Sequence, residues 1–178
     1  TAHCFGREVL QGLLDAGIDC LEHGTGLSVD QVEQMAAQGV ALVPTVLQTD
    51  KFPVFAEQGR EKFPAYADTM ESLHARRREA LMAAHEAGVA LYVGSDGGGT
   101  GRHGFLWEEV RAMHEMGMPA TEVLAAASWR AREWLGFAGL EEGAEADFVV
   151  LDRDPRVDLS VLAEPERVVL RGSVVAAR

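Results

Sequence analysis

The sequence is poor in cysteine, in basic residues and in long apolar runs. Its 178 residues include two cysteines, Cys4 and Cys20, too few for a disulfide framework in a chain of this length. Acidic residues outnumber basic ones by 28 to 16, and the net charge of −12 argues against a nucleic-acid backbone or an anionic membrane surface as partner. No apolar run is long enough to cross a bilayer and no signal-peptide layout is present, so the cytoplasm is the expected compartment.

The composition is ordinary for a folded domain. Hydrophobic residues make up 47% of the chain, so disorder is not expected. The length suits one good core and a small appended unit. The first residue is Thr1, within an expected strand, which suggests a piece of a longer chain.

Three short strand-like stretches end in side chains that bind metals. Residues 89–95 are apolar and β-branched and run into Asp96, followed by glycines. Two earlier stretches, 1–3 and 18–23, end in His3 and His23. Parallel strands of α/β proteins place their chemistry at the carboxyl ends. His, His and Asp at three such ends predict a metal site, although each residue alone is as consistent with a structural role.

Helical and strand-like segments alternate through the first half of the chain. The stretch 5–16 has helical periodicity, and a second helix begins after Ser28 as N-cap and ends at Gly39. Residues 40–44 form another apolar strand. Repeated strand–helix–strand units predict a parallel sheet covered by helices, hence an α/β fold.

The second half has three further features. Residues 45–64 lack periodicity and are expected to form a long irregular connection, either a lid over a substrate or a surface excursion pinned by aromatic side chains. Helices are expected over 65–87, 105–116 and 120–135, with Trp129 and Trp134 in the core or between helices. The tail is expected to contain a strand over 146–151 and a hairpin over 167–175 that turns at Gly172-Ser173.

Neutral imidazole and carboxylate groups suit Zn²⁺ and its neighbours in the first transition row. Such a metal lowers the pKa of a bound water to roughly 7, which makes a hydroxide available to attack an amide, an ester or a ring carbon. Asp96 is placed to take the proton from this nucleophile and pass it to a leaving nitrogen, and it can also ligate the metal.

The chain resembles the C-terminal half of an amidohydrolase-superfamily enzyme, in the imidazolonepropionase and Xaa-Pro-dipeptidase-like branch. The motifs that carry the resemblance follow one another along nearly the whole chain: Ala2-His3, Glu22-His23-Gly24, Val43-Pro44-Thr45, Gly94-Ser95-Asp96, His103-Gly104, Trp107-Glu108-Glu109, 117–128, 143–151, Asp154-Pro155 and 168–172.

This resemblance implies a fold and a set of site residues. The fold is the C-terminal half of a distorted (β/α)₈ TIM barrel over residues 1–139, with strands five to eight and their helices, followed over 140–178 by part of a small β-sandwich. His3, His23 and Asp96 resemble metal ligands at the ends of strands five, six and eight, and Asp96 also the catalytic proton carrier. In members with a single metal, His23 instead resembles a residue that contacts the substrate or the attacking water. His103 resembles a substrate-binding residue, with a loop-stabilising role as the alternative. Whether one or two ions bind stays open.

The first-strand His-x-His pair of the superfamily and the Lys or Glu of its fourth strand have no counterpart in the sequence. We therefore expect the chain to be active only together with an N-terminal half of the same enzyme, which is one of its two expected partners. The other is the substrate. The resemblance implies a metal-dependent hydrolase that cleaves the C–N bond of a small, dipeptide-like substrate, without nucleic-acid or membrane partners. The alternatives are a deaminase or cyclic-amidine hydrolase on the same scaffold, and a non-catalytic fragment or binding module. The substrate and any homo-oligomerisation stay open.

Overall fold

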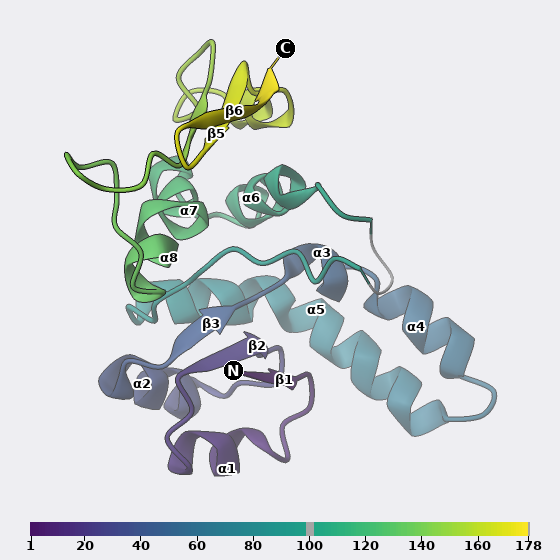
Figure 1. Cartoon of the computed structure of the whole chain (residues 1–178). Helices are drawn as coiled ribbons and strands as arrows, with labels where there is room; N and C mark the ends of the chain where they lie inside the picture. Colours follow the sequence, from purple (N-terminus) through teal and green to yellow (C-terminus); the bar gives the residue numbers. More distant parts are fainter. Residues whose placement is uncertain (99–101, 178) are drawn as a thin grey trace.

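The computed structural model describes residues 1–98 and 102–177 and has an α/β fold. Its first sheet contains β1 (Ala2–Cys4), β2 (Cys20–His23) and β3 (Ala41–Val43) in the order β1-β2-β3, with both pairs parallel (Figure 1). The strand expected before Asp96 is reduced to one parallel bridge between Leu91 and Leu42. The four segments therefore lie side by side in chain order and run in the same direction.

Short helices connect these strands, as the alternating pattern predicted. Helix α1 (Leu10–Asp15) is shorter than the expected stretch 5–16, and Val9 before it is exposed. Helix α2 (Val29–Gln38) begins at a capping box in which Ser28 and Gln31 each bond the other's backbone N–H. It ends at Gly39, whose φ of 72° is a conformation that glycine adopts without strain.

The prediction of a long irregular connection over residues 45–64 is wrong. The segment forms α3 (Val46–Thr49) and α4 (Phe52–Gly59), and α4 packs along α5 (Pro64–Glu86), the long helix that the sequence predicted. Phe52 is fully buried in a small second core with Ala56, Met70 and Leu73. The segment is thus a packed helical unit, which removes the basis for predicting a free lid.

The helix expected over 120–135 is also only partly correct. Helix α6 (Leu106–Glu115) follows the prediction, but the next one divides into α7 (Ala120–Ala127) and α8 (Trp129–Trp134) at Ser128. Trp129 and Trp134 are 53% and 43% exposed, so their expected burial is wrong for the described structure.

The tail forms a second, antiparallel sheet in the order β4-β5-β6, with β4 (Phe148–Val150), β5 (Arg167–Leu170) and β6 (Ser173–Ala177). The hairpin turns at Arg171-Gly172, one residue before the predicted position. A short 3₁₀ helix, η1 (Leu159–Ala163), packs on α6 and adds Leu159 to the main core.

The main core lies between the parallel strands and the helices that surround them, with Leu21, Leu42, Leu81 and Met113 among its buried side chains. Neither sheet is closed within the described residues. None of the helices formed by these residues combines the length and apolarity needed to cross a bilayer.

Candidate functional site

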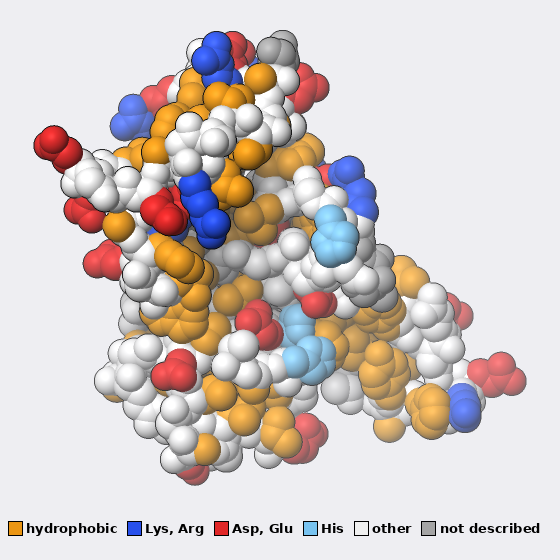
Figure 2. Space-filling view, viewed as in Figure 1, with side chains coloured by type: hydrophobic (Ala, Val, Ile, Leu, Met, Phe, Trp, Pro, Cys, Tyr) orange, Lys and Arg blue, Asp and Glu red, His pale blue; other side chains and the backbone are white. Residues whose placement is uncertain are grey.

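The site is built at the carboxyl edge of the parallel sheet. Because β1, β2 and β3 run in the same direction, their carboxyl ends meet at one edge, and His3 and His23 both lie there. Asp96 lies beyond the bridge at Leu91, at the same end of the fourth segment. In the space-filling view, histidine and acidic side chains come to the surface beside a hollow in the middle of the molecule (Figure 2).

His3 and His23 are in direct contact. Nδ1 of His3 lies 2.7 Å from Nε2 of His23, so one ring nitrogen donates a hydrogen bond to the other. The two ring centroids are 4.6 Å apart and the rings are nearly perpendicular, at 83°. His3 is exposed, whereas His23 is only 5% exposed. Two residues that are 20 positions apart in the sequence thus present one pair of facing nitrogens.

The surroundings of His23 keep its imidazole neutral. Burial, with a further contribution from His3, lowers the pKa of His23 to about 4, although the negative charge of Asp96 acts in the opposite direction. At neutral pH the ring is therefore uncharged, the form that binds metals. The effect of Asp96 also places its carboxylate within electrostatic range of His23.

Asp96 does not complete a preformed metal cluster. Within residues 1–98 and 102–177, no three His, Cys, Asp or Glu side chains are close enough together to hold one ion. Asp96 is exposed, and its backbone has a φ of 47°. The structure thus brings two of the three predicted ligands into contact and leaves the third nearby.

Thr45 belongs to the site and was not among the predicted site residues. Its Oγ1 lies 2.5 Å from Nδ1 of His23, the ring nitrogen on the side opposite to His3. The Thr45 side chain is buried, at 2% exposed. A visible signal was its place directly after the third strand, at the same edge as the predicted ligands.

Three residues at the carboxyl ends of the parallel segments have a left-handed backbone conformation. The φ angles are 68° at His23, 45° at Thr45 and 47° at Asp96. This conformation costs a residue other than glycine roughly 1–2 kcal/mol and is unusual for a β-branched residue such as threonine. Such strain persists only where the surrounding structure imposes it, and it concentrates at functional sites.

An aromatic wall supports the histidine pair. The Phe5 ring lies 4.5 Å from the ring of His3 and 4.4 Å from that of His23, measured between centroids. Phe5 also meets Phe52 of α4 edge-on at 4.8 Å, which connects the wall to the second core. The α3–α4 segment therefore supports the site from behind.

Glu109 of α6 is a fully buried carboxylate next to the strand ends. It accepts hydrogen bonds from the backbone N–H groups of Val46 and Leu47, the latter at 2.9 Å, at the start of α3. Burial raises its pKa to about 7, although the two amide hydrogen bonds act in the opposite direction. The signal in the sequence was an acidic residue within the apolar stripe of a helix, four residues before Met113.

His103 lies on the loop that follows Asp96 and is exposed. Its ring packs over Gly98, where a Cβ atom would come within 3.1 Å of His103 Cε1. Glycine at this position allows the loop to fold back on itself. Gly99-Thr100-Gly101, between Gly98 and His103 in the sequence, are outside the described residues. The position suits the loop-stabilising alternative, and no described contact tests a role in substrate binding.

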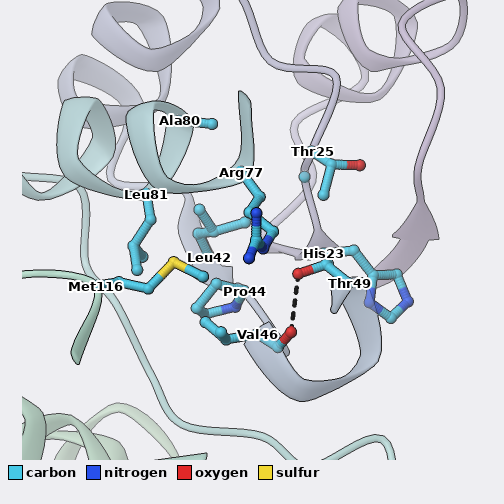
Figure 3. A pocket seen from close by; sticks show the side chains of 11 residues that line it. His23, Thr25, Leu42, Pro44, Val46, Thr49, Arg77, Ala80, Leu81 and Met116 are labelled. Atoms are coloured by element: carbon cyan, nitrogen blue, oxygen red, sulfur yellow. Dashed lines mark hydrogen bonds between the residues drawn. The ribbon is translucent and has the colours of Figure 1, made fainter. Parts of the chain in front are cut away.

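A small pocket lies behind the strand ends, between β3 and α5 (Figure 3). The residues around it are His23, Gly24, Thr25, Leu42, Pro44, Val46, Thr49, Arg77, Ala80, Leu81 and Met116. In Figure 3 the His23 imidazole is at its edge, on the side away from Leu81 and Met116. Neither His3 nor Asp96 lines it, so the pocket borders the candidate site and does not contain it.

The donor set at the edge fits a divalent metal. Two imidazoles present nitrogens to each other, and a carboxylate lies nearby, the ligand types that zinc takes in catalytic sites. Two nitrogens bound to a tetrahedral zinc are about 3.3 Å apart. The observed separation of 2.7 Å is that of a direct hydrogen bond, so the two rings must turn and move apart before both can bind one ion. The hydrogen bond of His23 Nδ1 to Thr45 is the kind of outer contact that orients metal-binding histidines.

Similar proteins match nearly the whole chain but extend well beyond it. A protein of Mycobacterium tuberculosis without an assigned activity is 46% identical over 172 residues, which are 97% of this chain and 46% of that protein. Ochratoxinase of Aspergillus niger is 28% identical over 176 residues, 94% of this chain and 35% of the enzyme. The chain thus spans about half the length, or less, of the curated relatives it matches.

A solved structure agrees with this relationship. A Xaa-Pro dipeptidase with methionine bound in its active site superposes with a TM-score of 0.85 at 26% identity, over 98% of this chain and 44% of that one. The model of the Amidohydrolase family matches residues 1–175. This chain therefore belongs to the amidohydrolase family.

Proposed function

We propose that the protein is a metal-dependent hydrolase that cleaves a C–N amide bond in a small, peptide-like substrate. The observation that carries the proposal is the contact between His3 Nδ1 and His23 Nε2 at the carboxyl edge of the sheet, in a chain of the amidohydrolase family. The likeness to a Xaa-Pro dipeptidase supports a peptide-like amide as substrate. The likeness to ochratoxinase supports a class of amide substrate wider than dipeptides.

In this proposal His3, His23 and Asp96 hold one or two divalent ions, of which zinc best suits the nitrogen donors. A metal bound there would lower the pKa of a water molecule to roughly 7 and so supply a nucleophile at neutral pH. His23 is kept neutral by its burial, so one of its two ring nitrogens carries a free lone pair in this range. Phe5 shields the inner side of the pair from solvent.

Asp96 carries the proton. Its carboxylate is exposed at the strand end, where it can accept a proton from the attacking water and donate it to the leaving amide nitrogen. The left-handed backbone at Asp96 fixes where the carboxylate leaves the sheet. His103, seven residues after Asp96 in the sequence, is proposed to contact the substrate.

The described sheet needs a complement. Within the described residues the parallel sheet is open, whereas a complete (β/α)₈ barrel is closed and has about 250 residues. We propose that an N-terminal half completes the barrel and provides the remaining metal ligands. The exposed Trp129 and Trp134 are apolar surfaces of the kind that such a half would cover.

The test uses the full-length protein. We expect purified protein to contain at least one zinc ion or related metal per chain, to release amino acids from a panel of Xaa-Pro dipeptides and N-acyl amino acids, and to lose this activity with a chelator. Ammonia release without amide cleavage would favour the deaminase or cyclic-amidine alternative. Protein that has neither metal nor turnover would favour the non-catalytic alternative and overturn the proposal.

A further inference from the structure

We propose that Glu109 is a positioning residue of the candidate site, which fixes the orientation and tautomer of His23 through α3 and Thr45. The inference rests on the proposed function only where it concerns the effect of Glu109 on catalysis. The connection itself consists of contacts within this chain, and it can be measured without any metal or substrate.

The first step runs from Glu109 to the start of α3. The two carboxylate oxygens each accept one backbone N–H, from Val46 and Leu47. Helix starts leave such N–H groups without partners inside the helix. Helix α3 has only four residues, and Thr45 before it makes no side-chain cap. Glu109 is therefore the group that satisfies these two donors, from a position 63 residues further along the chain than Val46.

The second step runs from α3 to Thr45. Thr45 has φ 45° and ψ 58°, a left-handed conformation that a β-branched residue seldom adopts. The peptide that follows it is the one whose N–H donates to Glu109, so the carboxylate holds the chain on the exit side of this strained residue. The backbone N–H groups of Gln48 and Thr49 donate to the Thr45 carbonyl and close the first turn of α3. Without Glu109, we expect Thr45 to relax towards an ordinary backbone conformation.

The third step runs from Thr45 to His23. The Thr45 hydroxyl is 2.5 Å from Nδ1 of His23, and Nε2 on the other side of the ring faces His3. A hydroxyl that accepts from Nδ1–H leaves Nε2 with a free lone pair, as a metal-binding imidazole requires. If the hydroxyl moves, the ring loses the partner that selects this tautomer.

Glu109 has no other evident task in the reaction. It is completely buried and two backbone amides occupy its oxygens, so it does not reach a substrate. A buried carboxylate is costly, and an apolar residue would pack equally well in the stripe of α6. A role that only a two-oxygen acceptor can perform explains why this position holds glutamate.

The experiment compares Glu109→Gln with Glu115→Gln in the full-length protein. Glu115 lies on the same helix but is exposed, and its carboxylate pairs with Arg111. Glutamine keeps the shape of Glu109 but replaces one acceptor oxygen by an amide that repels a backbone N–H. Long-range ¹H–¹⁵N spectra of ¹⁵N-histidine-labelled, metal-free protein report the tautomer of His23, and they are recorded above the Glu109 pKa of about 7, where this carboxyl is ionised.

We expect a single Nδ1–H tautomer of His23 in the wild type and in Glu115→Gln, and a mixture of tautomers in Glu109→Gln. The inference would be overturned if the chemical shifts of His23 in Glu109→Gln were the same as in the wild type. It would also be overturned if the wild type contained the Nε2–H tautomer. If Glu109→Gln does not fold, Thr45→Val tests the last step, because it removes the hydroxyl and leaves the α3 amides bonded. Unchanged chemical shifts of His23 in Thr45→Val would also contradict the inference.

A metal titration separates this inference from the proposed function. If the wild type binds zinc, competition with a chelator should show about 10–100-fold weaker affinity in Glu109→Gln, the usual effect of losing an outer contact of a ligand. Undiminished affinity would count against the positioning role. If the wild type binds no metal, the proposed function fails, and the tautomer comparison still decides the role of Glu109.

Discussion

Thr45 and His23 leave neighbouring parallel strands in the same left-handed conformation, and their side chains meet 2.5 Å apart. Two residues with a strained backbone are thus also two whose side chains are in contact at the carboxyl edge of the sheet. This contact makes the orientation of the His23 ring depend on Thr45, which is not one of the proposed metal ligands.

Replacing Thr45 by valine or by serine should separate its hydroxyl from its shape. Valine keeps the branched shape but removes the hydroxyl, so we expect kcat to fall about 10–100-fold. Serine keeps the hydroxyl and should retain most of the wild-type kcat. Steady-state kinetics on the full-length protein would measure both, and equal losses in the two variants would show that shape, not the hydrogen bond, matters at Thr45.

His3→Ala and Asp96→Asn should each abolish most turnover in the full-length protein. Loss of His3 removes one of the two facing nitrogens, so metal content should fall as well. Asp96→Asn removes the proton acceptor and should lower kcat by about 10²–10⁴-fold.

The matched control for the histidine is His85→Ala, in the last turn of α5 and remote from the sheet edge, which should keep its metal and its rate. Near-normal rates in His3→Ala or Asp96→Asn would mean that the site has been assigned to the wrong residues.

Stability should depend on pH through Glu109. Its pKa is raised from 4.5 when unfolded to about 7 in the fold, so its contribution is fully present below pH 4.5 and is lost as the pH rises through about 7. The loss is on the order of 3 kcal/mol. Glu109→Gln cannot ionise, so its unfolding free energy should fall less over this range.

Urea denaturation of metal-free wild type and Glu109→Gln at a series of pH values would measure this difference, because other titrating groups contribute equally to both curves. Parallel curves would contradict the assignment of the raised pKa to Glu109.

Cys4→Ser should have little effect on metal content. The Cys4 side chain is buried and donates to the Gly6 carbonyl at 3.2 Å, and burial together with the nearby charge of Glu8 raises its pKa. The thiol therefore stays protonated and is a poor metal ligand. Elemental analysis of the purified variant would measure the metal directly, and its loss would reveal a thiolate ligand.

The sequence predicted the parts of the fold that local chemistry decides. Apolar runs that end in His23 or run into Asp96, and the cap formed by Ser28, are visible without any knowledge of distant residues. Helix α3 is different, because its start depends on Glu109, which lies about 60 residues away in the chain. This dependence explains why residues 45–64 appeared irregular. Trp129 is a second case in which the sequence alone was not enough. Its large apolar side chain predicts burial, but the described residues provide no surface that covers it.

The site was partly predictable for a related reason. Side-chain type and position at a strand end identified His3, His23 and Asp96, but the backbone angles that single out Thr45 have no signature in sequence. Glu109 carried a weak signal as a charge within an apolar stripe. Its function becomes apparent only from the two amides it accepts.

The most direct measurement is anomalous X-ray scattering from crystals of the full-length protein, collected on both sides of the zinc absorption edge. The account predicts a peak within about 2.0–2.2 Å of ring nitrogens of His3 and His23, with the Asp96 carboxylate on the ion or on its bound water. A metal bound elsewhere, or a histidine pair that stays in direct contact in metal-saturated, active protein, would contradict it.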